Sequence, residues 1–139
     1  MNWEKTGMII KTKGLILSQR RYRERERYLS ILTEDLGLIE AKIRIFGQIN
    51  QQAYNTIGVL GYYEFDLYFG RQRYSVNAAE KLEDFYSLRE DVSSLALGEY
   101  FCELTAWLKP ETSSAGECLS FLLNCLYWLK EKRCSPVLL

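Results

Sequence analysis

LIEAKIRI, residues 38–45, alternates apolar and charged side chains. The apolar positions are Ile39, Ala41, Ile43 and Ile45, and the charged positions between them are Glu40, Lys42 and Arg44. Because successive side chains of a β-strand point to opposite faces, this order predicts a strand with one buried face and one face in water. The outward side of the expected sheet is therefore charged at this strand.

Four further segments of the first half carry strand signals. Residues 57–69 place one apolar set on a single face, namely Ile57, Val59, Tyr63, Phe65, Leu67 and Phe69. Shorter candidates are residues 8–17, 27–33 and 73–78. Gly14 predicts a β-bulge in the first of these, while Gly37 and Gly70 predict turns. Five strands in about 75 residues, without a long helix, are typical of a small barrel of the OB or SH3-like type.

The second half changes to helical periodicity. Capping boxes at residues 87–90 (SLRE) and 114–117 (SAGE) predict two helix starts. Apolar side chains follow each box at helical spacing and are expected to form packed cores: Leu97, Phe101, Leu104 and Leu108, then Leu119, Leu122, Leu123, Leu126 and Leu129. We therefore expect an α+β protein, in which a five-stranded OB-fold β-barrel over residues 1–80 precedes a partial α-helical domain over residues 81–139.

The last six residues, CSPVLL, predict the start of a third helix. Ser135 suits the N-cap and Pro136 the first helical position. Because the chain stops three residues later, we expect a truncated helical domain whose end promotes self-association.

Composition argues against an enzyme. The 139 residues include no histidine, and the sequence has neither of the glycine-rich phosphate-binding motifs. The four cysteines, Cys102, Cys118, Cys125 and Cys134, form no C-x-x-C pair, so we expect no metal, no cofactor and reduced thiols. No apolar run approaches the roughly 20 residues of a membrane span, and the N-terminus lacks a signal peptide, so we expect a cytoplasmic location.

The sequence RRYRERER, residues 20–27, concentrates charge in a chain whose formal net charge is zero. On a helix, Arg20 and Glu24 would pair and form a solvated face. On a hairpin arm, Arg21, Arg23, Arg25 and Arg27 would share one side, with Tyr22, Glu24, Glu26 and Tyr28 on the other. The hairpin alternative is either a solvated surface or a row of cations for a polyanion.

Charge is unevenly distributed along the chain. Residues 1–74 hold 12 Lys+Arg and 8 Asp+Glu, a net of +4, whereas residues 75–139 hold 6 and 10, a net of −4. In an OB-fold, ligands bind on strands 2 and 3 and between the loops that join strands 1–2 and 4–5. Basic residues fall at all three places, so we expect nucleic acid there, with cationic contacts from Arg20, Arg21, Arg23, Arg25, Arg27, Lys42, Arg44, Arg71 and Arg73, and base stacking on Tyr22 and Tyr28.

The sequence also resembles the bacterial recombination mediator and repair protein family RecO. The resemblance is carried by GLIL at 14–17, Tyr22-x-Glu24, and YLSILTEDLGLI at 28–39, followed by LRED at 88–91 and LALGEYFCELTAWL at 95–108. The family usually has a basic segment after strand 3, where this chain reads IRIFGQINQQAYN and keeps Arg44.

Membership would imply an OB-fold, a following helical domain and no catalytic residues. It would also imply binding of single- and double-stranded DNA, strand annealing, and partnership with RecR, single-strand-binding protein and, indirectly, RecA, at the nucleoid. Two alternatives stay open: an OB module whose arginines form a protein interface, and an RNA-binding OB domain.

Overall fold

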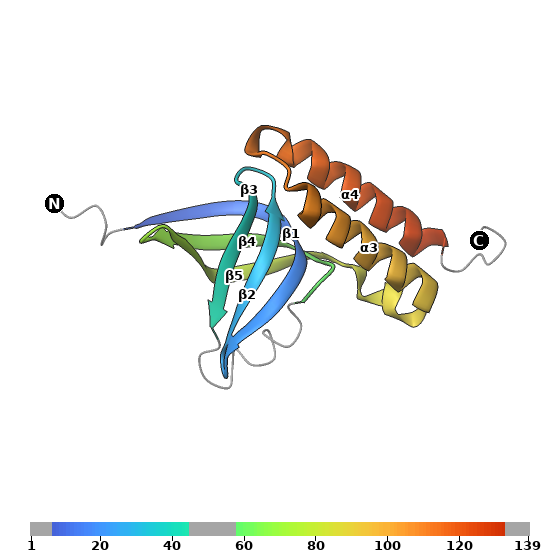
Figure 1. The fold of residues 1–139 in the computed structure, drawn as a ribbon, viewed down its shortest axis with the longest axis horizontal. Helices are drawn as coiled ribbons and strands as arrows, with labels where there is room; N and C mark the ends of the chain where they lie inside the picture. The colour runs from blue at the N-terminus through green and yellow to red at the C-terminus, as the bar shows by residue number, and fades with distance from the viewer. Residues whose placement is uncertain (1–6, 45–57, 133–139) are drawn as a thin grey trace.

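The computed structural model describes residues 7–44 and 58–132, which form a β-barrel with a pair of helices against one end (Figure 1). In chain order, the elements are β1 (Met8–Arg23), β2 (Glu26–Thr33), β3 (Gly37–Arg44), β4 (Gly61–Gly70), β5 (Arg73–Asp84), the 3-10 helix η1 (Phe85–Glu90), α3 (Val92–Leu108) and α4 (Thr112–Lys132).

The strands close into a barrel in the order β1-β2-β3-β5-β4. Neighbours are antiparallel except β3 and β5, which pair in parallel at Ala41–Tyr74 and Lys42–Ser75. The predicted OB-type barrel is therefore confirmed, and the chain is α+β.

β1 closes the barrel because it pairs with two strands, β4 and β2. Its first part pairs with β4 from Met8 to Leu15, and its second part pairs with β2 from Gly14 to Arg23. Gly14 lies where the two pairings overlap. A Cβ atom on it would lie 2.5 Å from Cγ2 of Ile31, so this position requires a residue without a side chain. The bulge predicted at Gly14 is wrong in position, since the register shifts between Ile16 and Ser18.

Two strands are longer than the sequence indicated. β1 continues through Arg23, so RRYRERER forms the end of the β1–β2 hairpin, which is the second of the two alternatives given for it, and the helical alternative is wrong. β5 continues to Asp84, well beyond the predicted residue 78. Two register shifts between β4 and β5 interrupt the alternation of apolar and polar residues in β5. The second half of this strand therefore has no alternating pattern from which it could be predicted.

The barrel core contains the alternating residues of β3 and β4, as predicted. Its buried members are Ile16, Leu29, Ile31, Ile39, Ala41, Ile43, Tyr63, Phe65 and Leu67. Burial raises the pKa of the Tyr63 phenol to about 12, with a smaller contribution from Asp84. Ile45 and Ile57, which we assigned to the same faces, lie outside the described residues.

Both helices begin at residues other than those predicted. The box at residues 87–90 lies within η1, and α3 instead has Asp91 as its N-cap, whose side chain accepts a hydrogen bond from the Ser93 backbone N–H at 3.2 Å. α4 begins at Thr112, two residues before the predicted cap Ser114. The third helix predicted at Ser135 lies outside the described residues.

α3 packs with its small residues. Its buried positions are Ser94, Gly98, Cys102 and Thr105, whereas Leu97, Leu104 and Leu108 of the predicted stripe are exposed. A Cβ atom on Gly98 would lie 3.3 Å from Leu88 and 3.5 Å from Leu126, so the close approach of neighbouring elements excludes large side chains there. The predicted stripe of α3 is therefore wrong for these three leucines, whereas its fourth member, Phe101, is partly buried and packs against the core. The predicted stripe of α4 is confirmed, with Leu119, Leu122, Leu126 and Leu129 buried and Leu123 partly buried.

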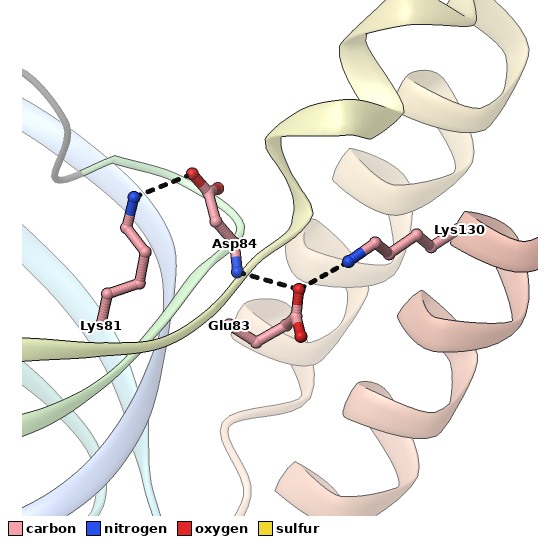
Figure 2. A network of polar contacts seen from close by, with 4 residues as sticks. All are labelled: Lys81, Glu83, Asp84 and Lys130. Carbon is pink, nitrogen blue, oxygen red and sulfur yellow. Dashed lines mark hydrogen bonds and ion pairs between the residues drawn. The ribbon is translucent and has the colours of Figure 1, made fainter.

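A second apolar cluster joins barrel and helices. It combines Leu15, Leu17 and Leu32 of the barrel with Phe85, Leu88 and the buried leucines of α4. Figure 2 shows the polar contacts beside it: the Lys130 ammonium of α4 donates to Glu83 at the end of β5 at 2.6 Å, and Lys81 donates to Asp84 at 3.2 Å. The division into domains at residue 80 stays a prediction, although β5 itself runs to Asp84.

Candidate nucleic-acid interface

A groove of about 680 Å³ lies over the outer face of β2 and β3. It is lined by residues from all five strands and from the β4–β5 turn: Arg20, Tyr22, Tyr28, Glu40, Lys42, Gly70, Arg71, Gln72, Arg73, Tyr74 and Ser75. These are the places at which an OB-fold binds its ligands.

Strand register brings the lining side chains together. Tyr28 pairs with Arg20 of β1 on one side and with Lys42 of β3 on the other. Lys42 is in turn the partner of Ser75 in β5. Since paired residues share a face of the sheet, segments distant in sequence contribute to one surface.

The groove has an excess of unpaired positive charge. Arg20 makes an exposed ion pair with Glu40 at 3.3 Å. Lys42, Arg71 and Arg73 have no ion pair within residues 7–44 and 58–132. Three cations therefore remain to neutralise a ligand with several negative charges.

Tyrosine rings provide the other component of the groove. Tyr22 and Tyr28 meet edge to face, with ring centroids 5.1 Å apart. The guanidinium of Arg20 lies 4.8 Å from the centroid of Tyr28, and that of Arg23 lies 5.0 Å from the centroid of Tyr22. Aromatic faces beside cations can stack on nucleobases while the charges contact phosphates.

The turn that carries the β4–β5 cations has an unusual backbone. Gly70 pairs with Arg73, so Arg71 and Gln72 form a two-residue hairpin loop. Both have positive φ, 54° and 62° respectively, as a type I′ turn requires. Asn-Gly is the favoured sequence for such a turn, and residues with longer side chains are strained in this region. Arg71, one of the two strained residues, lines the groove.

The row of four arginines predicted along the hairpin does not form. Arg21 pairs with Arg27, on the face opposite Arg20 and Tyr28, but a bulge at Tyr22 shifts the register before Arg23. Arg23 pairs with Glu26 instead, and Arg25 lies in the turn between the strands. The bulge adds one residue to β1, and this extra residue breaks the alternation on which the prediction rested.

Arg44 forms an ion pair with Glu26. Its guanidinium donates to Glu26 Oε1 from Nε at 2.8 Å and forms an ion pair with the same oxygen at 2.5 Å. Glu26 is buried, with 6% of its surface exposed. Arg44 therefore does not line the groove, although the sequence predicted it as a cationic contact there.

Sequence reasoning missed several lining residues. Glu40 shares its face with Lys42 by simple alternation, which could have identified it. Tyr74 and Ser75 follow Arg73 directly, but the pairing of β5 with β3 that brings them to the groove has no sequence signal.

Other kinds of site have little support in the described residues. No group of three or more His, Cys, Asp or Glu side chains within residues 7–44 and 58–132 could hold a metal ion. Burial raises the pKa of the Cys102 thiol to about 12, with Glu99 and Glu103 adding to the shift, so this cysteine is not a reactive thiolate. None of the helices in the same ranges combines the length and apolar character that crossing a membrane requires.

Fold and groove together define an OB-fold protein with a basic, tyrosine-lined surface in the position where this fold binds ligands. The chain matches the family described as "Recombination protein O N terminal" over residues 8–85. The chain belongs to this family, as its sequence resemblance indicated.

Similar curated proteins carry the name "DNA repair protein RecO". That of Alkaliphilus metalliredigens is 32% identical over 125 residues, covering 90% of this chain and 51% of the relative. That of Clostridium novyi is 29% identical over 124 residues, covering 89% and 48%. That of Acetivibrio thermocellus is 28% identical over 130 residues, covering 92% and 51%. The chain thus spans about half the length of the relatives it matches.

Proposed function

We propose that this chain is a non-enzymatic, sequence-neutral DNA-binding and strand-annealing module of recombinational DNA repair. Its relatives are named as DNA repair proteins, which supports the process. The same family resemblance suggests action in the cytoplasm, at the nucleoid, with RecR, single-strand-binding protein and, through them, RecA.

One observation carries the DNA-binding part of the proposal. Lys42 of β3, Arg71 of the β4–β5 turn and Arg73 of β5 line the same groove, without ion-pair partners in the described part of the chain. Phosphates would provide negatively charged partners for these cations, and unpaired bases would provide flat surfaces that stack on Tyr22 and Tyr28. Because base stacking and phosphate contact read no sequence, the groove suits single strands of any composition.

A salt titration tests this function. Each phosphate neutralised on a single strand contributes about −0.7 to the slope of log affinity against log salt, so three cations predict a slope of about −2. Replacing two of them, in the variant Arg71→Asn with Arg73→Gln, should flatten the slope by about 1.4 and weaken all sequences alike. Fluorescence anisotropy with a labelled oligonucleotide of about 16 nucleotides measures both quantities.

A matched variant separates the groove from the rest of the hairpin. Arg21→Gln with Arg25→Gln removes the same charge from positions outside the groove lining, and it should leave the slope unchanged. An equal loss in both variants would extend the site from the groove onto the hairpin arm, and a loss in the hairpin variant alone would move the site there. If neither variant alters binding, the arginines form a protein interface instead. Competition with RNA of the same sequence distinguishes the RNA-binding alternative.

A further inference from the structure

Among the described residues that line the groove, Glu40 alone is acidic. It lies on the outer face of β3, two residues before Lys42, and is exposed there. Its carboxylate contacts Arg20 of β1, whose Nη2 donates to Glu40 Oε1 at 3.3 Å. A carboxylate in this position repels phosphate and neutralises one cation of the groove. The groove thus contains a group that opposes the binding proposed for it.

Arg20 is held by two contacts at once. In addition to its ion pair with Glu40, its guanidinium lies over the ring of Tyr28, 4.8 Å from the centroid. A base cannot stack on the face of Tyr28 that the guanidinium covers. Through Arg20, Glu40 therefore withholds two components of the groove from a ligand, a positive charge and an aromatic surface.

Both contacts are of a kind that a ligand can displace. The side chains of Arg20 and Glu40 are 59% and 54% exposed, and ion pairs and cation–π contacts at such sites are weak. The ion pair runs diagonally across the strands, because the register partner of Glu40 is Ser30 and that of Arg20 is Tyr28. Rotation of the Arg20 side chain alone is sufficient to release both contacts, and its backbone in β1 keeps the charge at the groove.

We propose that Glu40 weakens DNA binding by holding Arg20 over Tyr28 in the free protein, until a single strand displaces it. One phosphate then replaces the carboxylate beside the guanidinium, and one base stacks on the uncovered face of the ring. The inference rests on the DNA-binding function proposed above, and Glu40 acts in it as a positioning residue. Weakened binding suits annealing, because a strand must leave the protein once it has paired with its complement.

Glu40→Gln tests the proposal, since it removes the charge and keeps the size of the side chain. Arg20 then becomes an additional phosphate contact, so the salt slope for a single-stranded oligonucleotide should steepen from about −2 to about −2.7. Affinity at moderate salt should rise about two- to fivefold. The matched control Glu64→Gln removes the same charge and an exposed ion pair with Lys11, outside the groove lining, and should leave the slope unchanged.

A double variant identifies the cation that is released. Arg20→Gln combined with Glu40→Gln should return the slope to about −2, because the additional phosphate contact is lost again. An unchanged slope in Glu40→Gln would overturn the proposal. A double variant as steep as Glu40→Gln would overturn it too, because the additional contact would then not come from Arg20.

Nuclear magnetic resonance of the free protein separates this inference from the function on which it rests. The ring of Tyr28 shifts the side-chain signals of Arg20, and Tyr28→Leu gives their positions without the ring. In Glu40→Gln the signals should move toward those positions. If they stay in place, Glu40 does not hold Arg20, and the inference fails even where DNA binds. If they move while no variant binds DNA, the proposed function is wrong, and the inference falls with it.

Discussion

At the scale of single residues, the two-residue turn between β4 and β5 combines backbone strain, which lowers the stability of the fold, with a cation at the groove. Arg71 and Gln72 both occupy the left-handed region, at a cost of about 1 kcal/mol or more each for residues with a Cβ atom. Of these two residues, only Arg71 contributes a positive charge to the groove. Strain of this kind is commonly concentrated at functional sites.

The two turn positions should therefore respond differently to substitution. Gln72→Gly should raise the free energy of unfolding by about 1 kcal/mol and leave the salt slope of DNA binding unchanged, because it relieves strain and removes no charge. Arg71→Asn should also stabilise the fold but weaken DNA binding. Urea denaturation followed by circular dichroism measures the first effect and anisotropy the second. A loss of stability in Gln72→Gly would mean that its side chain has a structural role of its own.

At the scale of elements, pattern reading succeeded where burial alternates and failed where it does not. β3 and β4 were predicted because one face of each is buried. The end of β1 was predicted only as one of two alternatives, because its strand form depends on backbone pairing with β2 and its side chains there are charged and exposed. The same difference explains the site. Tyr28, Lys42, Arg71 and Arg73 were assigned correctly to one surface, whereas the bulge at Tyr22 redirected the hairpin arginines.

The orientation of α3 could not be read from its sequence either. Its leucines predicted a buried stripe, but the side that packs is determined by how closely Leu88 and Leu126 approach Gly98. Such proximity is a tertiary property that no local pattern encodes.

Enlarging this small side of α3 should therefore destabilise the protein. Gly98→Val should lower the free energy of unfolding by about 1–3 kcal/mol, because overpacking outweighs the gain from replacing a helical glycine. The matched control Ala96→Val, at an exposed position of the same helix, should cost only about 0.5 kcal/mol. Chemical denaturation compares the two. Equal effects would show that α3 can move away from its neighbours.

At the scale of the whole molecule, the shared apolar cluster predicts one cooperative unit. Leu15, Leu17 and Leu32 of the barrel and the leucines of α4 bury one another, so neither part keeps a complete core alone. Barrel and helices should unfold in a single transition. Leu122→Ala should destabilise both by the same amount, about 2–5 kcal/mol. Hydrogen exchange of amides in β4 and α4 measures this, and protection lost only in α4 would indicate two independent domains.

Opposite charges at the two ends of the molecule have one more consequence. A basic barrel groove and an acidic helical pair give a chain of zero net charge a permanent electric dipole. A dipole feels little pull toward a distant polyanion, but within about 10 Å, the Debye length at 0.1 M salt, it experiences a torque. As a DNA strand approaches, the protein would therefore first rotate so that the barrel turns toward the phosphates. The helices would then face away from the strand while the groove is occupied.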